Sequence, residues 1–192
     1  MRFARADLVT YSPVTGPRAD GEGMTLAELC EATMITSDNT AGNLLVTALG
    51  GPAALTAWLR GMGDGVTRLD RMETALNEAR PGDPRDTTSP DAMLNGLGAL
   101  AVGDALRPAS RARLVDWLRR NRTGDARLRA GLPAGWTAGE KTGTASHNTS
   151  NDVGLLWPPN GVPPVIVAAF LTEGAADGAV RDAALAEVAA AV

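Results

Sequence analysis

Apolar residues recur every three to four positions over the first two thirds of the chain, which is the spacing of amphipathic helices. Thr25 and Glu28 form a capping box before the first of these helices. The pattern predicts five helices: residues 26 to about 34, one ending at Gly50, one starting at Pro52, one starting at Pro90, and residues 108–121. The helix after Pro90 is expected to be the buried centre of the helical region through an apolar stripe: Met93, Leu94, Leu97 and Leu100.

The hydrophobic period changes to two near Gly135, which is typical of strands. Three strands are predicted over residues 136–144, 152–157 and 164–172, and they should pair as an antiparallel sheet. The alanine-rich end of the chain, residues 177–192, should form a helix across that sheet with these residues inward: Val180, Ala184, Leu185 and Val188. The sequence therefore predicts an α+β protein. A mainly helical lobe (1–130) and a sheet lobe (131–192) should form one folding unit.

A charge-dense stretch, about residues 68–86, separates the third and fourth helices. It is too irregular for one helix and is predicted to be an Ω-loop. Arg71 and Asp86 lie at its two ends, so a bidentate ion pair between them would close its neck. The alternative is two surface charges that do not meet.

Composition excludes several classes of protein. The chain has 192 residues, of which 44% are hydrophobic, enough to form a core. Its net charge is −4, from 18 basic and 22 acidic residues, so a nucleic-acid partner is not expected. No apolar run approaches the roughly 18 residues of a membrane span, and no membrane association is expected. The first residues lack the apolar stretch of a signal peptide.

Cysteine and histidine each occur once, as Cys30 and His147. An internal disulfide or a cysteine metal cluster is therefore impossible, and Cys30 is expected to be a small buried hydrophobe. His147 falls in a predicted hairpin turn and should be exposed, without the partners for a metal site or a Ser-His-Asp triad. No metal and no cofactor is predicted.

Lys141 is the only lysine in the chain, and it lies in the segment Glu140-Lys141-Thr142-Gly143-Thr144. One ammonium followed by a hydroxyl and a glycine suits a strand edge that receives an anionic ligand, because glycine allows close approach. The tripeptide alone is a weak signal. Two further motifs strengthen it, Ser37-Asp38-Asn39 upstream and Glu73-Thr74-Ala75-Leu76-Asn77 between. In this order the three motifs resemble signatures of the class A serine β-lactamases.

The resemblance covers nearly the whole chain and implies the β-lactamase/transpeptidase fold and β-lactam hydrolysis through an acyl-enzyme. It implies that Ser37 and Lys141 deliver a proton to the leaving ring nitrogen. Glu73 and Asn77 would hold the deacylating water, with Glu73 as its base. It also implies substrate contacts by Tyr11, Asn39, Arg127, Thr142, Gly143 and the backbone N–H of Thr144.

Two departures from the family, at Ser150 and Thr74, and one match, at Cys30, accompany these roles. Ser150 stands where some relatives place the arginine that binds the substrate carboxylate, so Arg127 is the candidate for that contact; the alternative is a solvent arginine. Thr74 replaces a proline found in many relatives, which leaves the geometry of the Glu73–Thr74 peptide open. Cys30 matches a cysteine that in some relatives forms a disulfide with a residue just after the Ser-x-x-Lys signature.

That fourth signature, Ser-x-x-Lys, is not in this sequence, because the residue three before Lys141 is Ala138. The resemblance therefore implies a class A β-lactamase without its N-terminal portion, whose isolated chain lacks acylation activity. The expected partners are a β-lactam and a complementing N-terminal segment. In the family that segment supplies two of five strands, so a sheet edge should be exposed here. Family members are periplasmic or secreted.

Two other functions stay open. A D-alanyl-D-alanine transpeptidase or carboxypeptidase shares the serine-lysine chemistry, although the loop from Glu73 to Asn77 argues against it, since keeping an acyl-enzyme needs no deacylating base. The third possibility is a non-catalytic remnant that binds β-lactams.

Overall fold

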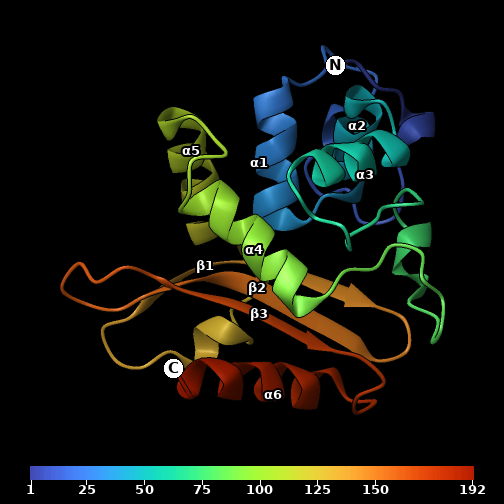
Figure 1. Ribbon diagram of the computed structural model, residues 1–192. Helices are drawn as coiled ribbons and strands as arrows, with labels where there is room; N and C mark the ends of the chain where they lie inside the picture. The colour runs from blue at the N-terminus through green and yellow to red at the C-terminus, as the bar shows by residue number, and fades with distance from the viewer.

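A computed structural model describes residues 1–192, with helices on both sides of a three-stranded sheet (Figure 1). The predicted α+β class is confirmed. Three helices gather near the N-terminus: α1 (Leu26–Thr36), α2 (Asn39–Leu49) and α3 (Pro52–Gly61). The predicted capping box is present, because Thr25 accepts from the Glu28 N–H and Glu28 accepts from the Thr25 N–H. α1 extends two residues past its predicted end, to Thr36.

Two helices connect this group to the sheet: α4 (Pro90–Ala101), which packs mainly on β3, and α5 (Pro108–Arg119), which packs on β1. The Ser89 hydroxyl caps α4 by accepting from the Ala92 N–H. The prediction that α4 is the buried centre of the helical lobe is wrong. Only Leu97 and Ala101 are buried, and Leu94 is 38% exposed. α4 contacts the sheet along one side only, so its neighbours bury Leu97 but leave Leu94 exposed.

The sheet is antiparallel with its strands in chain order: β1 (Thr137–Ala145), β2 (Thr149–Trp157) and β3 (Val165–Leu171). In the β1–β2 register Lys141 is opposite Val153. β2 begins three residues before its predicted start. The polar residues Thr149, Ser150 and Asn151 look like part of a turn, yet they pair with β1.

α6 (Gly178–Ala190) covers the sheet face opposite α4 and α5 (Figure 1). The short 3-10 helix η4 (Leu128–Gly131) packs between α6 and the sheet. This contact is close, because a Cβ at Gly131 would lie 1.8 Å from the Ala186 carbonyl oxygen. The buried residues of α6 are Leu185 and Ala189. Two residues predicted to face inward do not: Val180 is 54% and Val188 is 39% exposed.

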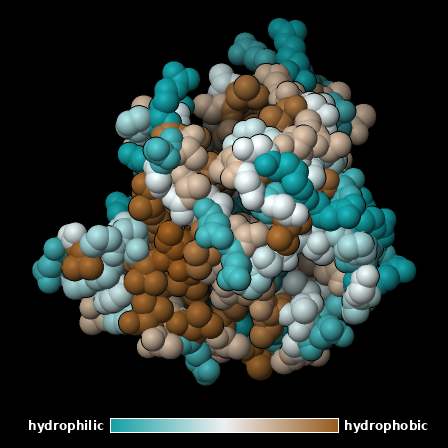
Figure 2. Space-filling view, viewed as in Figure 1, coloured by the Kyte–Doolittle hydropathy of each residue, from teal (hydrophilic) through white to brown (hydrophobic).

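The surface is not uniformly polar. On the face drawn in Figure 2, apolar surface gathers between α5 and α6, on the β3 side of the sheet. Val165 at the start of β3 is 38% exposed, and β3 is an edge strand in this structure. No single helix is long and apolar enough to cross a membrane; α2 and α3 meet the length and composition criteria only as a pair, bent by 68°.

The structure confirms the prediction for the single histidine and corrects the prediction for the single cysteine. His147 is exposed in the β1–β2 turn, as predicted, and its Nδ1 lies 3.1 Å from the Glu78 carbonyl oxygen. Cys30 is a free thiol on α1 that is only half-buried, so the expectation of a buried hydrophobe is wrong. Burial raises the pKa of this thiol, which keeps it protonated at neutral pH.

Candidate active site

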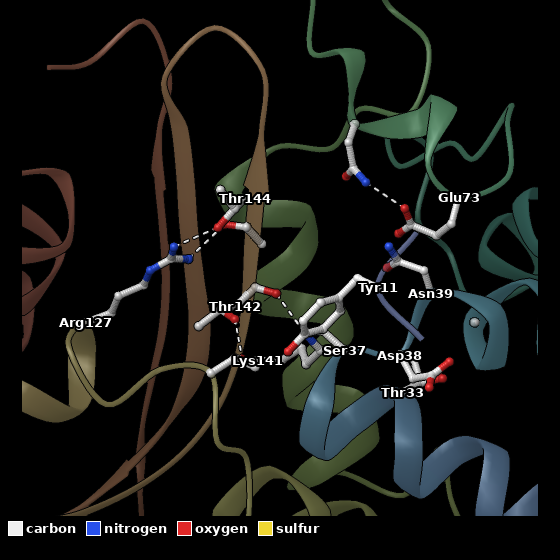
Figure 3. Close-up of a pocket in the computed structure, with 14 residues that line it drawn as sticks. Tyr11, Thr33, Ser37, Asp38, Asn39, Glu73, Arg127, Lys141, Thr142 and Thr144 are labelled. Atoms are coloured by element: carbon white, nitrogen blue, oxygen red, sulfur yellow. Dashed lines mark hydrogen bonds between the residues drawn. The ribbon is translucent and has the colours of Figure 1, made fainter. Parts of the chain in front are cut away.

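A cleft of about 430 Å³ opens where the α1–α2 turn, the Ω-loop and β1 meet. Fourteen residues line it, and only one of them is hydrophobic. All ten residues for which the sequence predicts catalysis or substrate contact lie along this cleft: Tyr11, Ser37, Asn39, Glu73, Asn77, Arg127, Lys141, Thr142, Gly143 and Thr144. Figure 3 shows Glu73 and Asn39 on one side and Arg127 and Thr144 on the other.

Ser37 and Lys141 meet in this cleft although 104 residues separate them. Ser37 ends α1 in the left-handed conformation, with φ 57° and ψ 40°, and its N–H is held by carbonyls of the last helical turn. The Lys141 ammonium donates to the Ser37 hydroxyl and, at 2.8 Å, to the Thr142 carbonyl. Burial lowers the pKa of Lys141 to about 8, although the carboxylates of Asp152 and Glu73 act in the opposite direction.

The buried Asp38 carboxylate fixes the turn that presents Ser37 and Asn39. It caps α2 by accepting from the Ala41 N–H at 2.9 Å, and it also accepts from the Val14 N–H and from both donors of Thr15. Asn39 is tied to the N-terminal loop as well. Its Nδ2 donates to the Thr10 carbonyl at 2.8 Å, and its backbone N–H donates to the Tyr11 carbonyl at 3.1 Å.

Tyr11 lies at the mouth of the cleft, where its side chain is largely open to solvent. The residue is 57% exposed and has a positive φ of 63°. The hydrogen bond from Asn39 to its carbonyl ties its backbone to the start of α2. The ring is therefore a wall of the entrance rather than part of the packed core (Figure 3).

Glu73 faces the cleft from the Ω-loop. Asn77 Nδ2 donates to its Oε2 at 2.6 Å, which places the carboxylate and the amide side by side. The Glu73–Thr74 peptide, left open by the sequence, is cis. Asn43 on α2 holds the Glu73 backbone, donating to its carbonyl at 2.9 Å and accepting from its N–H at 2.8 Å. Burial raises the pKa of Glu73, against the opposing effects of Asn77 and Lys141.

The sequence interpretation did not single out Asn43, although a signal for it exists. It lies four residues after Asn39, so both side chains share one side of α2. An amide there can satisfy both backbone groups of a neighbouring segment. Asn43 is therefore the contact that connects Glu73 to the same helix that carries Asn39.

Arg71 and Asp86 form the predicted ion pair at the neck of the Ω-loop, but the expectation of a bidentate pair is wrong, because Arg71 Nη1 donates to Glu78 Oε2 at 2.6 Å instead. Arg71 Nε donates to Asp86 Oδ2 at 2.6 Å, and the Asp86 Oδ1 accepts from the backbone N–H groups of Asp70 and Arg71 at 2.6 and 2.9 Å. The Asp86 side chain is only 2% exposed. The loop between them contains one short 3-10 turn, η3 (Ala75–Glu78), and is otherwise irregular.

Arg127 lines the cleft but is largely occupied by the protein itself. Its guanidinium donates to Asp182 at 2.8 Å, to the Gly143 and Asn151 carbonyls at 2.8 Å each, and to the Thr144 hydroxyl at 2.7 Å. One of its five N–H groups remains free of these contacts. Arg127 is therefore not a solvent arginine, since it is 8% exposed. The neighbouring Ser150 is buried and accepts from Arg181 Nε at 3.0 Å.

Two fully buried carboxyl groups lie behind β1, and the sequence interpretation assigned neither a role. The register puts Glu140 and Asp152 on one face of the sheet, one diagonal step apart. Asp152 accepts from the Leu128 N–H at 3.2 Å. Arg129 Nε lies 3.0 Å from Glu140 Oε1, an ion-pair distance, but the N–H is not aligned for a hydrogen bond.

Desolvation dominates the electrostatics of this pair. Burial raises the pKa of both carboxyl groups, and the charge of Glu140 adds to the rise for Asp152, whose pKa reaches about 8. Space behind the strand is limited, since a Cβ at Gly124 would lie 2.2 Å from Glu140 Oε1. Two acidic residues at inward positions of paired strands are the sequence signal for such a cluster, but the signal needs the register to be known.

Comparison with known proteins decides the family. The chain is 60% identical to an ancestral class A β-lactamase of known structure, with a TM-score of 0.96 over 99% of this chain and 72% of that one. The sequence model of the Beta-lactamase enzyme family matches residues 1–192. The chain belongs to the class A β-lactamases. The resemblance drawn from the three motifs is confirmed.

The curated β-lactamases that the chain matches are longer than this chain. It is 54% identical over 185 residues to β-lactamase FAR-1 of Nocardia farcinica, which covers 96% of this chain and 58% of the relative. It is 49% identical over 187 residues to β-lactamase AST-1 of Nocardia asteroides, covering 97% of this chain and 60% of the relative. The β-lactamase chain described here thus spans about three fifths of the length of these relatives.

Proposed function

We propose that this chain supplies the proton-relay and deacylation machinery of a class A β-lactamase that hydrolyses β-lactam antibiotics through an acyl-enzyme. One observation carries the proposal: the hydrogen-bonded pairs Ser37–Lys141 and Glu73–Asn77 open onto the same polar cleft. A transpeptidase is less well supported, because a buried carboxylate held beside an amide is what deacylation requires.

In the acylation half, Ser37 and Lys141 deliver a proton to the ring nitrogen as its bond to the carbonyl carbon breaks. The hydroxyl is suited to this relay because the ammonium donates to it directly. A lysine whose pKa lies near 8 gives up a proton more readily than an ordinary lysine. The cation also offsets the negative charge of a β-lactam carboxylate, to which Thr142 adds a hydroxyl.

In the deacylation half, Glu73 acts as the general base for the water that attacks the ester. Its raised pKa makes the carboxylate a stronger base than an exposed glutamate, and the Asn77 amide orients one of its oxygens. The same amide offers a contact for the attacking water. Both groups come from one turn of the Ω-loop, which keeps their spacing fixed.

Substrate contacts follow from the remaining lining residues. Asn39 offers an amide to the acylamino side chain, and the backbone of Gly143 and Thr144 lies along the strand edge that the carbonyl would approach. Arg127 supports this strand by binding the Gly143 carbonyl and the Thr144 hydroxyl, and its last N–H is left for the carboxylate. Tyr11 forms the outer wall of the entrance.

The nucleophile that Ser-x-x-Lys supplies in relatives is not among these 192 residues. We therefore propose that turnover needs a complementing segment that carries this signature, and that the chain by itself does not turn over β-lactams. In the family such enzymes act in the periplasm or outside the cell, and we propose the same location for the assembled enzyme.

Mixing the chain with a separately produced segment that carries Ser-x-x-Lys, taken from a class A relative, tests this function. A chromogenic cephalosporin should be hydrolysed only when both pieces are present. In the mixture, Glu73→Gln should slow turnover by about 100-fold or more and let the acyl-enzyme accumulate. Glu187→Gln on the exposed side of α6 is the matched control and should leave the rate unchanged. Hydrolysis that Glu73→Gln does not slow would contradict the proposed role, and rapid turnover by the chain alone would contradict the need for the segment.

A further inference from the structure

The Ser37–Lys141 pair has the composition of a nucleophile and its base, not only of a proton relay. We propose that Ser37 is itself a nucleophile in this chain, and that β-lactams acylate its hydroxyl once per molecule with Lys141 as the base. The inference rests on the proposed function in one respect, that a β-lactam enters this cleft. It revises the expectation, drawn from the lack of Ser-x-x-Lys, that the isolated chain cannot be acylated.

Geometry supports a reactive hydroxyl at this position. Ser37 lies on a tight turn between α1 and α2, in a left-handed conformation that its backbone hydrogen bonds fix, and it lines the cleft. A serine on a sharp turn between two elements is presented in this way in other acyl-transfer enzymes. The Lys141 amine is hydrogen-bonded to the hydroxyl, which is the contact a base requires. Serine-lysine pairs replace serine-histidine pairs in several unrelated hydrolases.

The charges around Lys141 allow it to act as a base. Asp152 and Glu73 favour its protonated form, Arg127 disfavours it, and burial disfavours it most strongly. With a pKa of about 8, a substantial fraction of the lysine is neutral in mildly alkaline solution. No other lysine is present in the chain, so no second lysine amine competes for this role.

The reaction needs no further reagent. Ser37 Oγ passes its proton to the neutral Lys141 Nζ and forms a bond to the lactam carbonyl carbon. The bond from that carbon to the ring nitrogen then breaks, and the nitrogen takes the proton back from the ammonium. The product is an ester that contains every atom of the β-lactam, so the protein gains the full mass of one antibiotic molecule.

Intact mass spectrometry of the 192-residue chain with benzylpenicillin tests the inference. We expect one adduct per chain, with peptide mapping that locates it on Ser37. Its rate should rise from about pH 6 and level off above about pH 8, as Lys141 becomes neutral. Repeating the reaction with Glu73→Gln removes the deacylating base, so the ester should accumulate to at least the same extent.

Three variants separate chemistry from binding. Ser37→Ala should abolish the adduct. Lys141→Arg keeps the positive charge but cannot act as a base, and it should slow the reaction by about 100-fold. Ser110→Ala, at an exposed serine on α5, is the matched control and should react normally.

The inference is overturned if neither the unmodified chain nor Glu73→Gln forms an adduct. It is also overturned if the adduct maps to another residue. Because mapping is done on the unmodified sequence, this conclusion does not depend on how well the variants fold. An outcome without adduct but with hydrolysis in the two-piece mixture removes this inference and leaves the proposed function intact. An adduct on Ser37 without hydrolysis in the mixture supports this inference and contradicts the proposed function.

Discussion

The Ω-loop and the strand β1 hold their charges in opposite ways. In the loop, acidic groups are paired with guanidinium groups: Arg68 with Asp70, Arg85 with Asp83, and Glu78 with Arg71 and Arg80. Hydrogen bonds from arginine lower the pKa of Asp70 to about 2, and those from Arg85 and Arg71 lower the pKa values of Asp83 and Glu78. On and behind β1, burial favours the uncharged form of each group. It lowers the pKa of Lys141 and raises the pKa values of Glu140 and Asp152.

This difference separates charges that hold a shape from charges that can move a proton. A carboxylate paired with arginine stays ionised throughout the neutral range, so it fixes the loop but exchanges no proton there. A desolvated group titrates closer to neutrality and can serve as an acid or a base. Glu73 is the exception within the loop, because its pKa is raised by burial like those of the sheet groups. The paired charges thus support one unpaired carboxylate that faces the cleft.

Removing the buried anchor of the loop should have the largest effect. Asp86→Ala deletes the acceptor of three hydrogen bonds and leaves Arg71 without its buried partner. We expect a loss of about 3 kcal/mol in the stability of the loop, or roughly 100-fold faster hydrogen exchange of its amides. Exchange measured by NMR or mass spectrometry checks this. Asp83→Ala, which removes an acceptor bound only to Arg85, should change exchange little. Equal effects of the two substitutions would contradict the anchor role of Asp86.

The buried carboxyl groups should make stability depend on pH in the opposite sense to paired ones. The pKa of Asp152 is raised from 3.8 to about 8 by burial and by Glu140, against smaller effects of Arg127 and Lys141. The folded state therefore holds a proton that the unfolded state releases, so its stabilising effect is complete below about pH 4 and is lost as pH rises to about 8.

Asp152→Asn should reduce this fall in the free energy of unfolding, since an amide does not titrate. Some dependence should remain, because the pKa of Glu140 is also raised. Urea unfolding at several pH values between about 4 and 8 measures the effect. Glu187→Gln at an exposed site should keep the full dependence. An unchanged slope in Asp152→Asn would show that this carboxyl group does not titrate in the predicted window.

Local sequence signals were sufficient for the elements and for the motifs of the cleft. The Thr25–Glu28 capping box and the glycines at residues 50–51 mark helix ends by backbone chemistry that acts within a few residues. The motif residues could be named because their types and order are specific. Their arrival in one cleft is then a consequence of the fold, which the family resemblance supplied.

Features that depend on packing between distant segments could not be read in the same way. Leu94, Val180 and Val188 fit helical stripes, but which side of a helix is covered depends on the neighbours it meets. The Arg127 guanidinium donates hydrogen bonds to Asp182 and to two strand carbonyls, and these partners lie far from it in the chain. No periodicity contains that information.

The pKa of Lys141 tests the central claim most directly, that a desolvated lysine and a serine hydroxyl form a proton-transfer pair in the cleft. Because the chain has one lysine, labelling lysine with carbon-13 gives a single side-chain signal whose titration can be followed by NMR. We predict a midpoint at about 8. A midpoint at the ordinary lysine value of about 10.4 would mean that the amine is solvated, and it would contradict both the relay and the acylation of Ser37.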